Sequence, residues 1–238
     1  MRARACFSVL LFSCFLVIQG CAALRVPQPE PRSILSLPHS EIPVYGVGAK
    51  EPAFEYLKDA LSPMPAPVRN SVVLFSIQDG NPSGHFENEP AHCHSHSRKI
   101  CILKNQFGNY VNALDCVWHE TAHAYFHTPP SSATDEWKEI AGPVYGRPYD
   151  PLMDFFKDFA KDGCLTLYSL TEYGEDIAEF TRVSYGYVFL YKKHGFSGAN
   201  DFRGEFKKDD RYIRKLKYLL KWGFITQEMY DVISPLLQ

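Results

Sequence analysis

His119 and His123 are the residues whose type and spacing point most directly to chemistry. They bound the segment His-Glu-Thr-Ala-His at residues 119–123, and a spacing of four residues places both imidazoles on one face of a helix. Two such imidazoles can share one tetrahedral zinc ion. Glu120 follows the first histidine, where its carboxylate can accept a proton from an attacking water. The segment predicts a zinc site with His119 and His123 as ligands and Glu120 as general base.

A zinc site of this kind needs a third protein ligand. A metzincin would place a glycine three residues after the second histidine and another histidine three residues further on. Phe126 and Pro129 occupy those positions, which excludes that class. The remaining common ligand is a carboxylate from a downstream helix. Glu175 and Glu179 lie one turn apart on such a helix, and Glu172 is a further candidate.

The downstream segment also has a recognisable pattern. Tyr168 is followed by six residues and then by Glu-Asp-Ile-Ala-Glu at residues 175–179. Together with residues 119–123, this resembles gluzincins of the anthrax lethal factor catalytic-domain type, whose pattern is HExxH, then Tyr, six residues and Glu-x-x-Ala-Glu. The resemblance covers residues 117–127 and 168–180. It implies that Glu175 is the third zinc ligand, that Tyr168 stabilises the oxyanion, and that Glu179 supports a ligating histidine.

The expected activity is therefore that of a zinc-dependent endopeptidase. Glu120 would take a proton from the attacking water, and zinc with Tyr168 would hold the oxyanion that forms on the carbonyl. A peptide or protein is the expected substrate. The alternative is a surface lipoprotein that binds zinc but does not hydrolyse, acting as a recognition module. The presence of Glu120 argues against that alternative.

A second group of histidines precedes the zinc segment. His92, His94 and His96 alternate along the chain, so on a strand they would share a face and could bind a second metal. We favour a polar loop for this stretch. His127 lies one turn beyond His123, and we expect it at the rim of the cleft.

The beginning of the chain has the composition of a targeting segment. Two arginines precede an apolar stretch within residues 1–20, which is typical of a secretory signal peptide. The sequence Ile-Gln-Gly-Cys at residues 18–21 resembles a bacterial lipobox, whose cysteine is acylated. We expect a lipoprotein of the bacterial cell envelope anchored through Cys21, or a secreted protein if Cys21 is not acylated.

Composition predicts one globular domain after a short linker. Residues 21–43 are rich in proline and lack helical periodicity, which indicates a tether. Residues 44–238 are long enough to bury a core. The net charge of −2 argues against a nucleic-acid partner. No later stretch has the roughly 20 apolar residues needed to span a bilayer, so we expect a monomeric domain that meets a membrane only through Cys21.

The cysteines outside the leader fit an exported chain. Cys93, Cys101, Cys116 and Cys164 are an even set, and in an oxidising compartment such a set favours two disulfides. Three pairings are possible, of which we favour Cys93 with Cys101 and Cys116 with Cys164.

The periodicity of the chain predicts an α+β domain of zincin-like type. A small N-terminal sheet would pack against the helix that carries residues 119–123, and a helical C-terminal half would supply Glu175. Asn112 is the expected N-cap of the metal-binding helix. The expected strands are residues 72–77 and 99–104, and the expected helices are residues 51–61, 112–127, 131–140, 174–192, 209–222 and 226–237.

Overall fold

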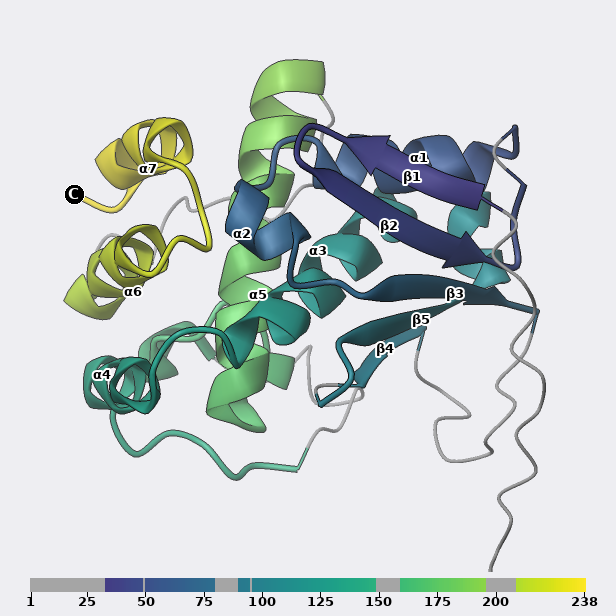
Figure 1. Ribbon diagram of the computed structural model, residues 1–238. Helices are drawn as coiled ribbons and strands as arrows, with labels where there is room; N and C mark the ends of the chain where they lie inside the picture. The colour runs from purple at the N-terminus through teal and green to yellow at the C-terminus, as the bar shows by residue number, and fades with distance from the viewer. Residues whose placement is uncertain (1–32, 49, 80–89, 95, 149–158, 196–208) are drawn as a thin grey trace, which may run out of the picture.

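The computed structural model describes residues 33–48, 50–79, 90–94, 96–148, 159–195 and 209–238. A five-stranded sheet from the N-terminal half packs against helices, and the C-terminal half is helical (Figure 1). This agrees with the expected α+β arrangement. Residues 1–32, with the signal peptide and Cys21, lie outside the described part, so those assignments stay predictions. Within the described part, no helix is long and apolar enough to cross a membrane.

The sheet has the strand order β1-β2-β3-β5-β4. The outer pairs β1/β2 and β4/β5 are antiparallel, while β2/β3 and β3/β5 are parallel. Strands β3 and β5 agree with the two predicted strands, because their alternate apolar residues face the core. The strands are β1 (Ser33–Leu37), β2 (Ser40–Tyr45), β3 (Leu74–Gln78), β4 (Ala91–His94) and β5 (Lys99–Leu103).

The hairpin β1–β2 corrects the predicted tether. The sequence predicts a proline-rich tether over residues 21–43, and for residues 33–43 that prediction is wrong. Leu35 and Ile42 face each other across the two strands and are both buried. Pro38 lies in the turn, where it removes no bond between the strands. Only residues 21–32 are left for a tether, and they lie outside the described part.

The helices closely follow the predicted ranges. Helix α3 begins two residues before the predicted start, and its N-cap is Asn109, whose side chain accepts a hydrogen bond from the Asn112 backbone at 3.2 Å. Helix α5 is continued by a π-helix over Gly186–Lys193. The α-helices are α1 (Pro52–Leu61), α2 (Ala66–Arg69), α3 (Tyr110–Phe126), α4 (Ser131–Ala141), α5 (Tyr173–Tyr185), α6 (Asp210–Lys221) and α7 (Gln227–Ile233).

Helix α3 occupies the centre of the molecule. Figure 1 shows the sheet on one side, α4, α6 and α7 on the other, and α3 with α5 between them. Trp118 is fully buried on α3, and its indole N–H donates to the Ala60 carbonyl of α1 at 2.8 Å. On the opposite side, the Tyr125 hydroxyl donates to the Trp222 carbonyl at 2.9 Å. These contacts hold α3 from two sides, so the side chains of residues 119–123 have a defined direction.

Candidate metal centre

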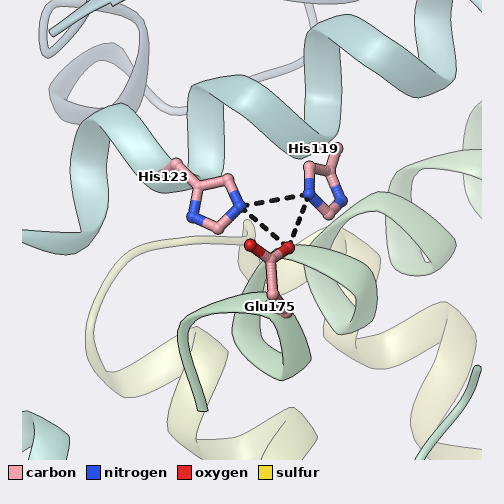
Figure 2. A group of neighbouring side chains, drawn as sticks. All are labelled: His119, His123 and Glu175. Carbon is pink, nitrogen blue, oxygen red and sulfur yellow. Dashed lines mark hydrogen bonds and ion pairs between the residues drawn. The ribbon is translucent and has the colours of Figure 1, made fainter. Parts of the chain in front are cut away.

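Three side chains from two helices converge at one point. His119 and His123 extend from α3, and Glu175 extends toward them from the first turn of α5 (Figure 2). Glu175 Oε2 lies 3.0 Å from His119 Nε2 and 3.2 Å from His123 Nε2, and the two Nε2 atoms are 3.1 Å apart. The three atoms form a nearly equilateral triangle. Among the described residues, these three are the group that could hold a metal ion.

The size of the triangle fits a small divalent ion. Zinc binds nitrogen and carboxylate oxygen at about 2.0–2.1 Å, which makes the edge of a tetrahedral site about 3.3 Å. The observed separations of 3.0–3.2 Å are close to that edge. Two imidazoles and one carboxylate are also a donor set that suits zinc, although other transition metals accept it.

The protonation of His119 explains why these atoms need a cation. Its Nδ1–H donates to Glu179 Oε1 at 2.9 Å, so in the neutral ring Nε2 is an acceptor. Two acceptor atoms, His119 Nε2 and Glu175 Oε2, then face each other at 3.0 Å. Burial alone would lower the pKa of His119, but hydrogen bonds to Glu175 and Glu179 outweigh it and raise the pKa to about 10. A proton therefore occupies the triangle when no metal does.

Glu175 is held as an anion by the same contacts. Burial alone would raise its pKa, but the hydrogen bonds with His119 and His123 lower the pKa of Glu175 to about 2. An ionised carboxylate can bind a divalent cation without first losing a proton. The ligand set is therefore ready to bind metal at neutral pH, apart from the proton on His119.

A series of charged side chains supports His119 through its second ring nitrogen, Nδ1. Glu179 Oε1 also accepts from Arg182 Nε at 2.9 Å, and Glu179 Oε2 accepts from Arg182 Nη2 at 2.9 Å. Arg182 then reaches Asp115 Oδ2 with Nη1 at 3.2 Å. Burial opposes ionisation of Glu179, but the charge of Arg182 holds its pKa well below the usual range. The carboxylate stays ionised and fixes the tautomer and direction of the His119 ring.

Arg182 and Asp115 were not anticipated from the sequence. Arg182 lies three residues after Glu179 on α5, a spacing that brings side chains together on a helix, so it could have been found. Asp115 lies four residues before His119 on α3, but its contact with Arg182 depends on how α3 and α5 cross.

A cavity of about 390 Å³ opens over the three ligands. Its lining includes Glu120 and Tyr168 as well as His119, His123 and Glu175. Glu172 lines the same cavity but does not belong to the ligand group. His127 lies at its edge as expected, where it forms the C-cap of α3.

Tyr168 reaches the cavity from a short segment just before α5. It begins a 3-10 helix, Tyr168–Leu170, and its ring centroid lies 5.9 Å from that of His119. The backbone N–H and the hydroxyl of Thr171 both donate to the Tyr168 carbonyl, at 3.1 and 2.8 Å. Gly146 N–H donates in turn to the Thr171 carbonyl at 3.1 Å. The turn that carries Tyr168 is thus fixed by backbone contacts on both sides.

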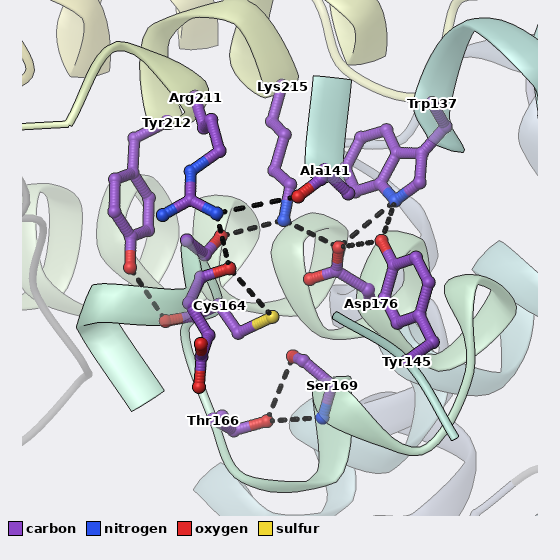
Figure 3. A network of polar contacts seen from close by, with 12 residues as sticks. Trp137, Ala141, Tyr145, Cys164, Thr166, Ser169, Asp176, Arg211, Tyr212 and Lys215 are labelled. Atoms are coloured by element: carbon purple, nitrogen blue, oxygen red, sulfur yellow. Dashed lines mark hydrogen bonds and ion pairs between the residues drawn. The ribbon is translucent and has the colours of Figure 1, made fainter. Parts of the chain in front are cut away.

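A buried ion pair anchors the start of α5, next to Glu175. Asp176 and Lys215 both have 0% side-chain exposure, and Lys215 Nζ donates to Asp176 Oδ2 at 2.6 Å. The same oxygen accepts from the Tyr145 hydroxyl at 2.7 Å and from Trp137 Nε1 at 3.0 Å (Figure 3). Lys215 also donates to the Gly163 carbonyl at 2.7 Å. These contacts join α4, α5, α6 and the segment before Tyr168 into one unit that fixes the direction of Glu175.

Strand β4 forms another part of the cavity lining. Ala91, His92 and Cys93 all contribute to it. We expected a polar loop here, and that prediction is wrong for residues 91–94, because His92 and His94 pair with Cys101 and Lys99 in the sheet. The rings of His92 and His94 lie on one face with centroids 4.8 Å apart. The histidine alternation was therefore the signal of a strand.

The cysteines do not form the predicted disulfides. Cys93, Cys101, Cys116 and Cys164 are all free thiols in the structure. Cys93 on β4 lies opposite Ile100 on β5. Cys101 follows Ile100, so its side chain is on the other face of the sheet from that of Cys93. Cys164 lies in a small separate apolar cluster, away from Cys116. Burial, followed by the charge of Glu120, raises the pKa of Cys93, which stays a neutral thiol beside the cavity.

Comparison with known proteins adds no relative. No family model, curated protein or solved structure matches the chain. The functional conclusion therefore depends on the residues of the site itself.

Proposed function

We propose that this chain is a zinc-dependent peptidase of the gluzincin type, with a zincin-like domain formed by the sheet, α3 and α5. The observation that carries the proposal is the triangle of His119, His123 and Glu175, with donor atoms 3.0–3.2 Å apart in a cavity that Glu120 also lines. A structural zinc site has four protein ligands. Here three candidate ligands and a neighbouring carboxylate open on a cavity, which favours a hydrolytic site over a structural one.

The shape of the surroundings supports a peptide as substrate. Strand β4 is an edge of the sheet, and in the described part it pairs with β5 alone. Its residues 91–93 also line the cavity. An extended peptide can add to such an edge through main-chain hydrogen bonds, which would bring its carbonyl groups past the ligands.

Each residue of the cavity then has a role in hydrolysis. Zinc held by His119, His123 and Glu175 would supply positive charge to polarise the substrate carbonyl and acidify water. Glu120 takes a proton from the attacking water and later delivers it to the leaving amine. The Tyr168 hydroxyl donates a hydrogen bond to the carbonyl oxygen as it gains negative charge. Glu179 keeps the His119 ring in the orientation that points Nε2 toward the position of the metal.

The test compares the wild type with Glu120→Gln on a peptide library, with zinc content measured in both. We expect both chains to hold about one zinc, while cleavage is seen only with the wild type. Cleavage by Glu120→Gln at the wild-type rate would overturn the mechanism. Zinc binding without cleavage by the wild type would favour a recognition module in place of a peptidase. Export and a lipid anchor at Cys21 are part of the proposal and are tested separately by mass spectrometry of the mature N-terminus.

A further inference from the structure

A second hollow lies beside the metal cavity. It has a volume of about 390 Å³ and is lined by His96, Arg98, His127 and Thr128. His127 lines both spaces, so they are neighbours. Two of the lining residues come from the turn between β4 and β5, and two from the end of α3. The hollow is therefore bounded by α3 and by the turn that follows β4, and both α3 and β4 also line the metal cavity.

The backbone of Arg98 is in a conformation that arginine rarely adopts. Its φ is +52°, in the left-handed region that favours glycine and asparagine. The turn is closed by the N–H groups of Ser97 and Arg98, which donate to the His94 carbonyl at 3.0 and 2.7 Å. The turn itself would accept asparagine more readily. Arg98 thus has a strained backbone and lines a hollow beside the candidate active site. This combination indicates a functional role for its side chain.

The charge of Arg98 is not neutralised within the described part of the chain. No carboxylate there lies within ion-pair distance of its guanidinium, a property it shares with Arg69 and Arg214, whereas the other described arginines, Arg147, Arg182 and Arg211, pair with Asp162, Glu179 and Asp209. Arg98 is also exposed to solvent. The hollow thus offers a permanent positive charge to an incoming group.

The chemistry of the lining favours an anion over a second metal. In the described residues, His96 and His127 do not belong to any group of three metal-ligating side chains. The cation of Arg98 would also repel a metal ion at close range. A guanidinium binds a carboxylate through two parallel hydrogen bonds, and the Thr128 hydroxyl can donate a further one.

We infer that this hollow is a substrate subsite that binds the carboxylate of an acidic side chain near the scissile bond. The inference rests on the proposed function and names its substrate class. A peptide extended along β4 advances by about 3.3 Å per residue, and β4 runs from the metal cavity directly into the turn that holds Arg98. Glu120, Glu172 and Glu175 make the metal cavity itself acidic. The acidic residue of the substrate would therefore be selected at the Arg98 end and not beside the ligands.

The test uses tripeptide hydroxamates, whose hydroxamate group chelates the metal. The panel carries glutamate or glutamine at each position, with the hydroxamate at either end so that both sides of the site are sampled. Affinities for the zinc-loaded chain are measured by calorimetry and need no catalysis. At one position we expect glutamate to bind at least tenfold more tightly than glutamine.

Two variants identify the source of that preference. Arg98→Asn removes the charge and suits the positive φ, so we expect an unchanged or raised melting temperature and a glutamate preference reduced to within twofold. Lys104→Gln is the matched control, because it removes one positive charge beyond the other end of β5, where Lys104 pairs with Asp79. We expect this control to keep the tenfold preference.

The outcomes separate this inference from the proposed function. Equal affinities for glutamate and glutamine in the wild type, or a preference that survives in Arg98→Asn, would overturn the subsite even if peptides are cleaved. A preference that depends on Arg98 in a chain that cleaves no peptide would support binding of an acidic side chain at Arg98 but refute the peptidase, and with it the role of the hollow in substrate cleavage. Failure of every hydroxamate to bind would contradict both the subsite and the proposed zinc-dependent peptidase.

Discussion

The support of His119 by Glu179 gives a prediction whose size can be worked out from the structure. Glu179→Gln replaces a carboxylate that accepts three hydrogen bonds, one from His119 and two from Arg182, each at 2.9 Å. The amide of glutamine has one acceptor oxygen and one NH₂ group. If its oxygen keeps the contacts of Oε1, its NH₂ faces Arg182 Nη2, and two donors meet. The variant therefore loses one charge-assisted hydrogen bond and weakens the others.

Two separate losses follow from this change. Loss of a hydrogen bond to a charged group costs about 1.5–3 kcal/mol of stability. Loss of the partner that orients a ligating histidine lowers metal affinity by about 10–100-fold, which is about 1.4–2.8 kcal/mol. We expect zinc affinity in Glu179→Gln to fall within that range. Glu172→Gln should bind zinc within threefold of the wild type, because Glu172 lines the cavity without belonging to the ligand group.

The assay is competition for zinc against a chromogenic chelator at a temperature where both variants are folded by circular dichroism. This condition separates metal affinity from stability. A folded Glu179→Gln chain with wild-type zinc affinity would refute the reasoning, since it would mean that the 2.9 Å contact with Glu179 does not support His119 as a ligand.

Three further predictions concern the buried network, the oxyanion and the proton on His119. Lys215→Met leaves Asp176 buried without its cation and should lower the free energy of unfolding by about 3–5 kcal/mol; in urea denaturation the double variant with Asp176→Asn should be more stable than the single one, and the reverse order would contradict this. Tyr168→Phe should reduce kcat by about 10²–10³-fold with zinc content unchanged, and an unchanged kcat in steady-state assays would remove its role. The folded-state pKa of His119 is raised to about 10 from 6.5, so its contribution to stability is complete below pH 6.5 and is lost as the pH rises toward 10. Urea unfolding in the presence of chelator should therefore show falling stability over that window, and saturating zinc should remove the trend because the metal replaces the proton; a flat profile without zinc would speak against the assignment.

The ligand triangle could be predicted because its parts are local in sequence. The four-residue spacing of His119 and His123 defines a helix face, and the same holds for Glu175 and Glu179 on α5. That the two faces meet was expected from the need for a third ligand, and the family resemblance selected Glu175 over Glu172 and Glu179. The crossing of α3 and α5 that brings them together depends on packing between distant residues.

The incorrect predictions share a physical cause, which is that short strands are stabilised by their neighbours. Strand β4 has four residues and two of them are histidines, so its own composition favours a loop. It is a strand because β5 supplies the partner groups. The same holds for the hairpin of residues 33–45, where prolines concealed the alternation of buried residues. The disulfide between Cys93 and Cys101 was predicted from their closeness in sequence, but pairing of Cys93 with Ile100 in the sheet puts the Cys101 side chain on the other face.

The network around Asp176 could not be predicted from the sequence. Asp176 and Lys215 are separated by 39 residues, and each resembles an ordinary surface charge in its own helix. Only the contact of α5 with α6 and α4 makes the pair buried. Because Asp176 adjoins Glu175, this buried pair fixes the position of the proposed third ligand.

The central claim is that this chain holds one zinc ion at the triangle of His119, His123 and Glu175. The most direct measurement is elemental analysis of the purified chain without residues 1–21, together with His123→Ala and Glu175→Ala. We predict about one zinc per chain in the wild type, and loss or strong weakening of zinc binding in both variants while circular dichroism shows them folded. A folded wild type without zinc, or folded variants that keep it, would contradict the account.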